Sequence, residues 1–215
     1  MRRFGITALL VAGFASPLAA QHQAHGGGGH ALPPGWHARA DRADQNVSEV
    51  MFMAMGSGFH VRTGPAVILW NAEHSGEGNY TVTATFTQGK TPERLDAYGI
   101  FFGGSDLSGE GQAYTYFLVR HNGRFIVKNR LGMERPPTII EWTEHAAVAK
   151  PDESGSSQNT LSVEVGADKV RFLANGSEVA SLDRSAVAAT NGVAGLRVNH
   201  GLDLIVEGFA VSKGM

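Results

Sequence analysis

The densest group of side chains with recognisable binding chemistry lies in residues 112–130, where aromatic and basic residues alternate. Tyr116, Arg120, Lys128 and Arg130 belong to this segment. Aromatic rings stack on the apolar face of a sugar ring, while cations and amides fix its hydroxyl groups. The segment therefore indicates a carbohydrate-binding surface. The alternative is that these cations lay their aliphatic stems over a covered sheet and pair with acids.

Two further candidate ligand-binding residues, Trp70 and His200, come from other parts of the chain. Trp70 ends an apolar run, and His200 stands in a turn beside Asn199 and close to Arg197. An aromatic ring and an imidazole at such places could line the rim of a pocket. The backbone needs of the turn are a sufficient alternative explanation for the residues around His200.

Metal-binding candidates fall in two places. His22, His25 and His30 form a His-x2-His-x4-His run among glycines. Imidazoles bind Cu(II), Ni(II) or Zn(II), but a glycine-rich segment fixes no geometry, so incidental composition is the alternative. Asp106 follows two glycines in a predicted loop, where carboxylate and carbonyl oxygens suit a hard cation such as calcium. No motif requires a cofactor, and calcium is the one candidate.

The sequence argues against several classes of enzyme. The chain has no cysteine, which excludes disulfides, thiolate metal sites and cysteine catalysis. It also lacks Gly-x-Ser-x-Gly, Ser-x-x-Lys, Gly-x-x-x-x-Gly-Lys and His-Glu-x-x-His. Whether the chain is an enzyme stays open, with the balance against it.

Short β-strands are the elements that must position these residues. Apolar residues alternate with threonine from Tyr80 to Phe86, which is the pattern of a half-buried strand. Further strands are predicted over 50–55, 58–62, 66–70, 97–102, 138–142, 161–165, 192–198 and 202–211. Helical turns are expected only over 184–190 and 38–47. The pattern predicts an all-β fold, an antiparallel two-sheet β-sandwich (jelly roll), with a closed barrel as the alternative.

Two Asn-Gly pairs, at 122–123 and 175–176, predict β-hairpins with two-residue type I′ turns. A two-residue turn at 122–123 places Tyr116 and Arg120 on the face that also carries Phe125. Lys128 and Arg130 would then lie on the opposite face.

The amino-terminal composition indicates export. Residues 1–20 combine Arg2-Arg3, an apolar run and a small-residue end, as a secretory signal does, so a periplasmic or secreted location is expected. The apolar run is too short to span a bilayer, and no membrane insertion is expected. We divide the chain into this signal, a His/Gly-rich flexible tail at 21–35 and a β-sandwich domain at 36–215. A formal charge of −2 without a basic run argues against a nucleic-acid partner.

Five segments carry a family resemblance: residues 56–61, 98–104, 114–120, 194–200 and 202–209. They resemble secreted bacterial proteins of the concanavalin A-like lectin/glucanase superfamily, in particular laminin G-like modules and the domain associated with 3-keto-disaccharide hydrolases. The resemblance implies a jelly roll, a fold that hosts lectins, glycosidases and adhesion modules alike. The Glu-x-Asp-x-Glu strand motif of the retaining glucanases is missing, which argues against their mechanism.

Three functional hypotheses follow. The first is an exported, non-catalytic module that binds carbohydrate or an envelope glycan. The second is a glycoside hydrolase acting on a modified disaccharide, which would gather His60, Asp106 or His200 in one pocket with acids or a metal. The third is a periplasmic metal-binding protein that uses the histidine tail.

Overall fold

The computed structural model describes residues 31–134 and 136–214. The predicted signal and His22, His25 and His30 lie outside the described residues. The strands are β1 (Trp36–Ala40), β2 (Met51–Met55), β3 (Gly58–Arg62), β4 (Val67–Gly76), β5 (Tyr80–Gln88), β6 (Ala97–Ser105), β7 (Ala113–Arg120), β8 (Arg124–Leu131), β9 (Thr138–Glu144), β10 (Ser157–Val165), β11 (Lys169–Ala174), β12 (Ser177–Asp183), β13 (Gly192–Val198) and β14 (Asp203–Lys213). Two short 3-10 turns, η1 (Val47–Glu49) and η2 (Arg184–Ala186), accompany them.

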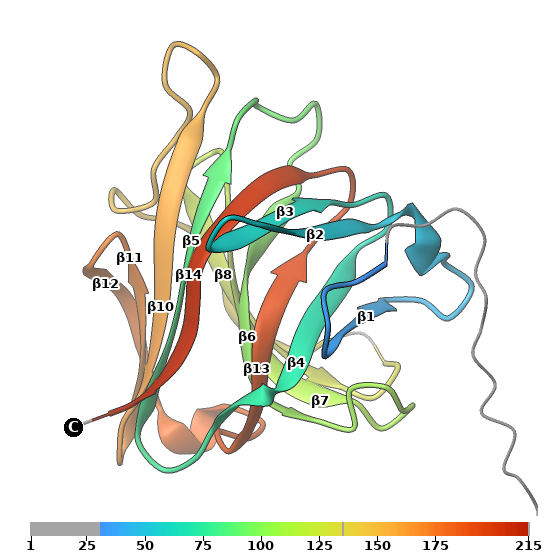
Figure 1. Cartoon of the computed structure of the whole chain (residues 1–215). Coiled ribbons are helices and arrows are strands. Elements are labelled where there is room, and N and C mark those ends of the chain that lie inside the picture. Colours follow the sequence, from blue (N-terminus) through green and yellow to red (C-terminus); the bar gives the residue numbers. More distant parts are fainter. Residues whose placement is uncertain (1–30, 135, 215) are drawn as a thin grey trace, which may run out of the picture.

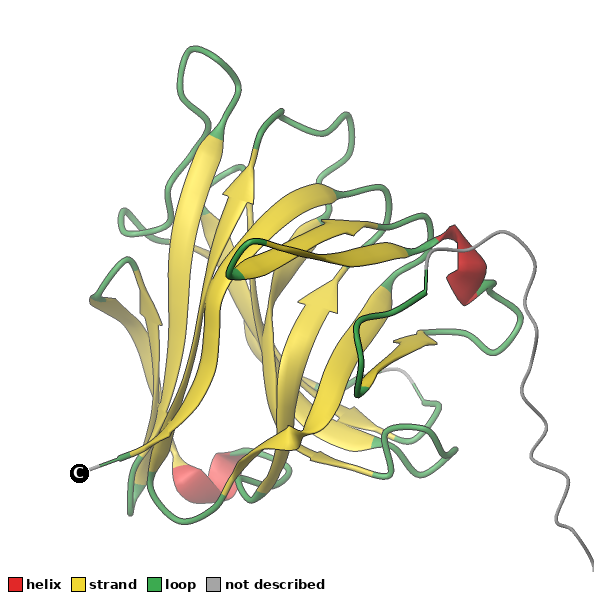
Figure 2. Cartoon of the chain, viewed as in Figure 1, coloured by secondary structure: helices red, strands yellow, loops and turns green. Residues whose placement is uncertain are grey.

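The strands form two seven-stranded antiparallel sheets that face each other (Figure 1). Sheet A has the order β1-β4-β13-β6-β7-β8-β9, and sheet B has the order β12-β11-β10-β5-β14-β3-β2. Figure 2 shows how little helix there is beside the strands. The all-β two-sheet sandwich is therefore confirmed. No helix among the described residues is long and apolar enough to cross a membrane.

The main core lies between the two sheets, and the alternation predicted for β5 explains it. Tyr80, Val82, Ala84 and Phe86 are at most 2% exposed, while the threonines between them are half-buried. Burying a side chain such as that of Phe86 contributes about 1.5–3 kcal/mol. Side chains of β10 and β6 complete this layer.

A second apolar cluster covers the outer face of sheet A, which is the face turned away from sheet B. It contains Ile68, Trp70, Ala97, Phe101, Leu107, Tyr114, Tyr116, Leu118 and Ile126. Leu107 belongs to the loop after β6, and Arg39 of β1 donates hydrogen bonds to the carbonyls of Leu107 and Gly109. Because this loop covers part of the sheet, β6 is buried on both faces, which accounts for its unbroken apolar sequence.

The turn between β7 and β8 differs from the prediction. Arg120 pairs with Arg124, so three residues form the loop, and only Gly123 in it has a positive φ, of +79°. The amide of Gly123 donates to the carbonyl of Arg120 at 3.0 Å. This is the three-residue hairpin that ends in a left-handed glycine, so the two-residue type I′ prediction is wrong here. The type I′ prediction for Asn175-Gly176 is confirmed, since both residues have positive φ.

The extra turn residue shifts the register of β8 by one and reverses its faces. Tyr116 now stands opposite Lys128, and Tyr114 stands opposite Arg130. The prediction that the tyrosines and these cations lie on opposite faces is therefore wrong. They share the outer face of sheet A.

The helical turn expected within 38–47 is also wrong. Residues 36–40 form β1, which pairs with β4 at the edge of sheet A. The ring of Trp36 packs against Phe52 and Phe59 with centroids 4.9 Å away in each case. Leu32, from the predicted tail, also packs against the core.

Candidate functional site

The candidate site is built on the outer face of sheet A, where β7, β8 and β13 bring aromatic and basic side chains together. Arg197 of β13 lies at its centre, with only 6% of its side chain exposed. Its Nη1 and Nη2 atoms donate to the two carboxylate oxygens of Asp41, each at 2.6 Å. Nη1 also donates to the hydroxyl of Tyr114 at 3.2 Å, and the guanidinium carbon lies 4.7 Å from the Tyr116 ring centroid. This contact network fixes the loop after β1 over the sheet.

Electrostatics keep this pair ionised. Burial acts to raise the pKa of the Asp41 carboxyl, but the nearby Arg197, Arg130 and His200 outweigh it, and the pKa lies below its usual value. Burial also raises the pKa of Tyr116 to about 12, although Arg197 opposes this shift. Tyr116 is therefore a neutral residue whose ring packs against the Arg197 guanidinium.

A cavity of about 340 Å³ opens above this network. It lies between the segment that follows β1 and the segment that follows β8, and its lining includes Asp41, Arg130, Met133, Pro136 and His200. Arg130 is only 6% exposed. Its Nη2 donates to the Asp41 carbonyl at 3.3 Å, and its Nε atom has no partner. The cavity thus combines apolar walls with a few convergent polar groups, as ligand sites do.

A neighbouring cavity of about 330 Å³ adjoins the first at His200, which lines both. Its other lining residues include Pro92, Glu93 and Asp96. The Nδ1 atom of His200 lies 3.6 Å from a carboxylate oxygen of Asp96.

Only some of the six predicted ligand-binding residues line the cavity on this face. Arg130 and His200 line the same cavity, and Tyr116 lies buried below it. Arg120 stacks on the Trp142 ring, 3.2 Å from its centroid. Lys128 is half-buried and stands opposite Tyr116 in the sheet. Trp70 is buried beside His37 and lines a different cavity. The structure thus brings two of the six together in one cavity.

The residues proposed for a hydrolytic site do not converge. His60 of β3 contacts Asp203 at 2.7 Å on sheet B. Asp106 lies in the loop after β6, where its carboxylate accepts a hydrogen bond from the amide of Gly111 at 3.0 Å. His200 follows β13, which runs antiparallel to β6, so it lies at the opposite end of sheet A from Asp106. Within 31–134 and 136–214, no group of three or more potential metal ligands is gathered.

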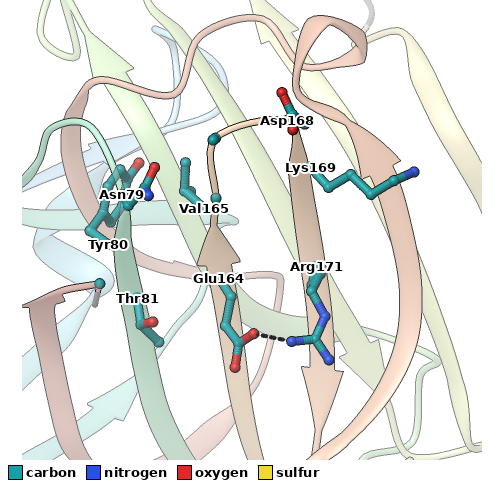
Figure 3. A pocket seen from close by; sticks show the side chains of 11 residues that line it. Asn79, Tyr80, Thr81, Glu164, Val165, Asp168, Lys169 and Arg171 are labelled. Carbon is teal, nitrogen blue, oxygen red and sulfur yellow. Dashed lines mark hydrogen bonds and ion pairs between the residues drawn. The ribbon is translucent and has the colours of Figure 1, made fainter.

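Another hollow, of about 580 Å³, lies beside β5, β10 and β11 (Figure 3). Its charged groups satisfy one another, because Arg171 contacts both Glu164 and Glu178 at 2.6 Å. Figure 3 shows the Glu164–Arg171 pair on the surface of sheet B. The charged groups of this hollow are therefore already paired with one another, whereas Arg130 on sheet A has no ion pair within the described part of the chain.

The sequence reasoning missed Asp41, although one signal could have indicated it. Arg197 is the one charged residue in the apolar run of β13, and a buried cation needs a carboxylate partner. Nothing local in the sequence shows that the partner lies 156 residues earlier.

Comparisons with known proteins establish the class of fold. No protein-family model and no curated protein matches the chain. A carbohydrate-binding module from Bacillus subtilis, CBM66, is similar with a TM-score of 0.61 and 12% identity, covering 83% of this chain and 96% of that one. A galectin-like protein of unknown function from the same organism has a TM-score of 0.57 at 12% identity, covering 83% and 89%.

The carbohydrate recognition domain of Emp47p is also similar, with a TM-score of 0.52 and 10% identity, covering 86% of this chain and 91% of that domain. At these identities the likeness shows the fold alone. The β-sandwich of this chain thus has the same overall fold as these three domains.

Proposed function

We propose that this chain is a non-catalytic module that binds a glycan on the outer face of sheet A. The observation that carries the proposal is the pair of adjoining cavities at His200, one of which contains the buried Arg130. The lectin-like fold and the carbohydrate-binding neighbours support it. The pattern of residues 1–20 supports an extracytoplasmic setting in which the ligand is a polysaccharide or an envelope glycan.

We assign different tasks to the site residues. Tyr116 is 4% exposed and holds Arg197 in place, so the apolar contact with a sugar ring falls to Met133 and Pro136 at the cavity wall. Arg130 and His200 supply the hydrogen bonds that orient the ligand. A rigid sheet below and two loops above form a site that is largely prepared before binding.

Affinity gel electrophoresis against a panel of polysaccharides, followed by titration calorimetry on the positive ligands, tests the proposal. His200→Ala should weaken binding by about tenfold, since a loss near 1.4 kcal/mol is expected for one hydrogen bond in the site. His60→Ala is the matched control, because His60 is also partly exposed and also contacts a carboxylate, but on sheet B. Equal effects of the two substitutions, or no binding to any glycan, would refute the proposed site.

A further inference from the structure

We infer that the cavity at Arg130 takes an anionic sugar unit, with a carboxylate or sulfate group bound by the Arg130 guanidinium. This inference rests on the proposed glycan-binding function and specifies the class of ligand.

Arg130 and Arg197 share one nearby carboxylate, that of Asp41, so Arg130 has no ion-pair partner of its own among the described residues. Asp41 uses both carboxylate oxygens for Arg197, so it offers Arg130 only its backbone carbonyl, at 3.3 Å. Among the described residues, Arg130 forms no ion pair within 4 Å, and its Nε atom has no hydrogen-bond partner. Because a buried, unpaired cation is costly, an anion entering this cavity would gain a strong and already oriented partner.

The geometry of a guanidinium favours this class of ligand. The planar group of arginine donates two parallel hydrogen bonds to a carboxylate or a sulfate, a match that lysine cannot reproduce. The Asp41–Arg197 pair shows the same arrangement at the cavity, which Asp41 lines, with both contacts at 2.6 Å. A uronic acid carboxylate or a sugar sulfate therefore has the right shape for the Arg130 guanidinium, which lines the cavity.

The remaining charges at the cavity sharpen the expectation. Arg42 pairs with Asp44 at 2.7 Å on the surface and is not available. Glu134 lines the same cavity and is exposed, and it forms no ion pair among the described residues. Its carboxylate repels an anionic ligand from the rim, whereas it would accept hydrogen bonds from the hydroxyls of a neutral sugar. Removing Glu134 therefore has opposite consequences for the two kinds of ligand.

Titration calorimetry with polygalacturonate, dextran sulfate and unmodified dextran tests the inference on the full chain. We expect binding to at least one of the two anionic polymers and an affinity for dextran at least tenfold weaker. Arg130→Gln should weaken anion binding by tenfold or more, and Arg130→Lys should retain part of it. Glu134→Gln should strengthen it about two- to fivefold. Arg124→Gln, an exposed cation on the same strand, is the matched control and should leave binding within about twofold.

The outcomes separate the inference from the proposed function. Binding of dextran alone, or of other neutral glycans that lose affinity with His200→Ala, would overturn the anionic ligand and leave glycan binding intact. No binding to any glycan would overturn both. Anion binding that Arg130→Gln leaves unchanged would also refute the assignment. If circular dichroism shows that Arg130→Gln does not fold, Glu134→Gln provides the test, because Glu134 is exposed and its substitution should not disturb the fold. Weaker anion binding by Glu134→Gln would contradict the inference.

Discussion

The ion pair between Asp41 and Arg197 is the residue-scale feature on which the candidate site depends. Arg197 is almost fully buried, so the loss of its partner would leave an uncompensated charge in a layer of aromatic rings. Breaking a buried ion pair on one side typically costs about 3–5 kcal/mol. The pair also joins the loop after β1 to the centre of sheet A.

Asp41→Asn tests this role through its dependence on pH. We expect the free energy of unfolding to fall by about 3 kcal/mol at neutral pH. This value is at the lower end of the range for a broken buried ion pair, because Asp41 is partly exposed. The pKa of Asp41 is lowered in the folded state, so its contribution is present above the unfolded value of about 4 and is lost as the pH falls through the folded value. Urea unfolding at about pH 7 and about pH 3 should show the difference between wild type and variant narrowing in acid. A difference that stays constant would contradict the ion pair.

At the scale of secondary-structure elements, the two Asn-Gly hairpins differ from each other: the same dipeptide forms two different turns. Asn175 has a φ of +51°, and its side chain makes hydrogen bonds with Thr160, Ala147 and Asn159. Asn122 has no positive φ, and its Oδ1 atom has no partner. Only the first asparagine is needed for the backbone conformation of its turn.

Alanine substitutions at the two positions should therefore differ in effect. Asn175→Ala should destabilise the fold by about 2 kcal/mol or more, since alanine is strained at positive φ and three hydrogen bonds are lost. Asn122→Ala should change the stability by less than about 0.5 kcal/mol. Thermal unfolding of both variants provides the comparison, and equal losses would contradict the three-residue turn between β7 and β8.

These turns also show how far the sequence determines the elements. Alternation placed Tyr80, Val82, Ala84 and Phe86 of β5 on the core side, because a strand period of two is a local property. It could not determine the length of the 121–123 turn, where one extra residue reverses the faces of β8. Nor could it pair Asp41 with Arg197, since that contact depends on how distant strands are arranged in the sheet. Arg130 and His200 were identified by residue type, and only the fold brings them to one cavity.

At the scale of the whole molecule, sheet A separates two apolar layers of unequal importance. The layer between the sheets contains Phe102 and joins strands from the entire chain. The layer on the outer face is smaller, and the loop after β6 contributes Leu107 to it. Because few elements rest on the outer layer, we expect it to open without global unfolding.

Leu107→Ala and Phe102→Ala separate local opening from global stability. Phe102→Ala should lower the free energy of unfolding by about 3–5 kcal/mol and speed amide exchange in both sheets. Leu107→Ala should act mainly on its own loop, where the amides of Gly109 and Gly111 donate to the backbone and side-chain oxygens of Asp106. Hydrogen exchange followed by mass spectrometry should show faster exchange in residues 106–111, with β5 and β10 still protected. Uniform loss of protection in the Leu107 variant would mean that the outer layer is an integral part of the core, and that the loop after β6 cannot move independently of the sandwich.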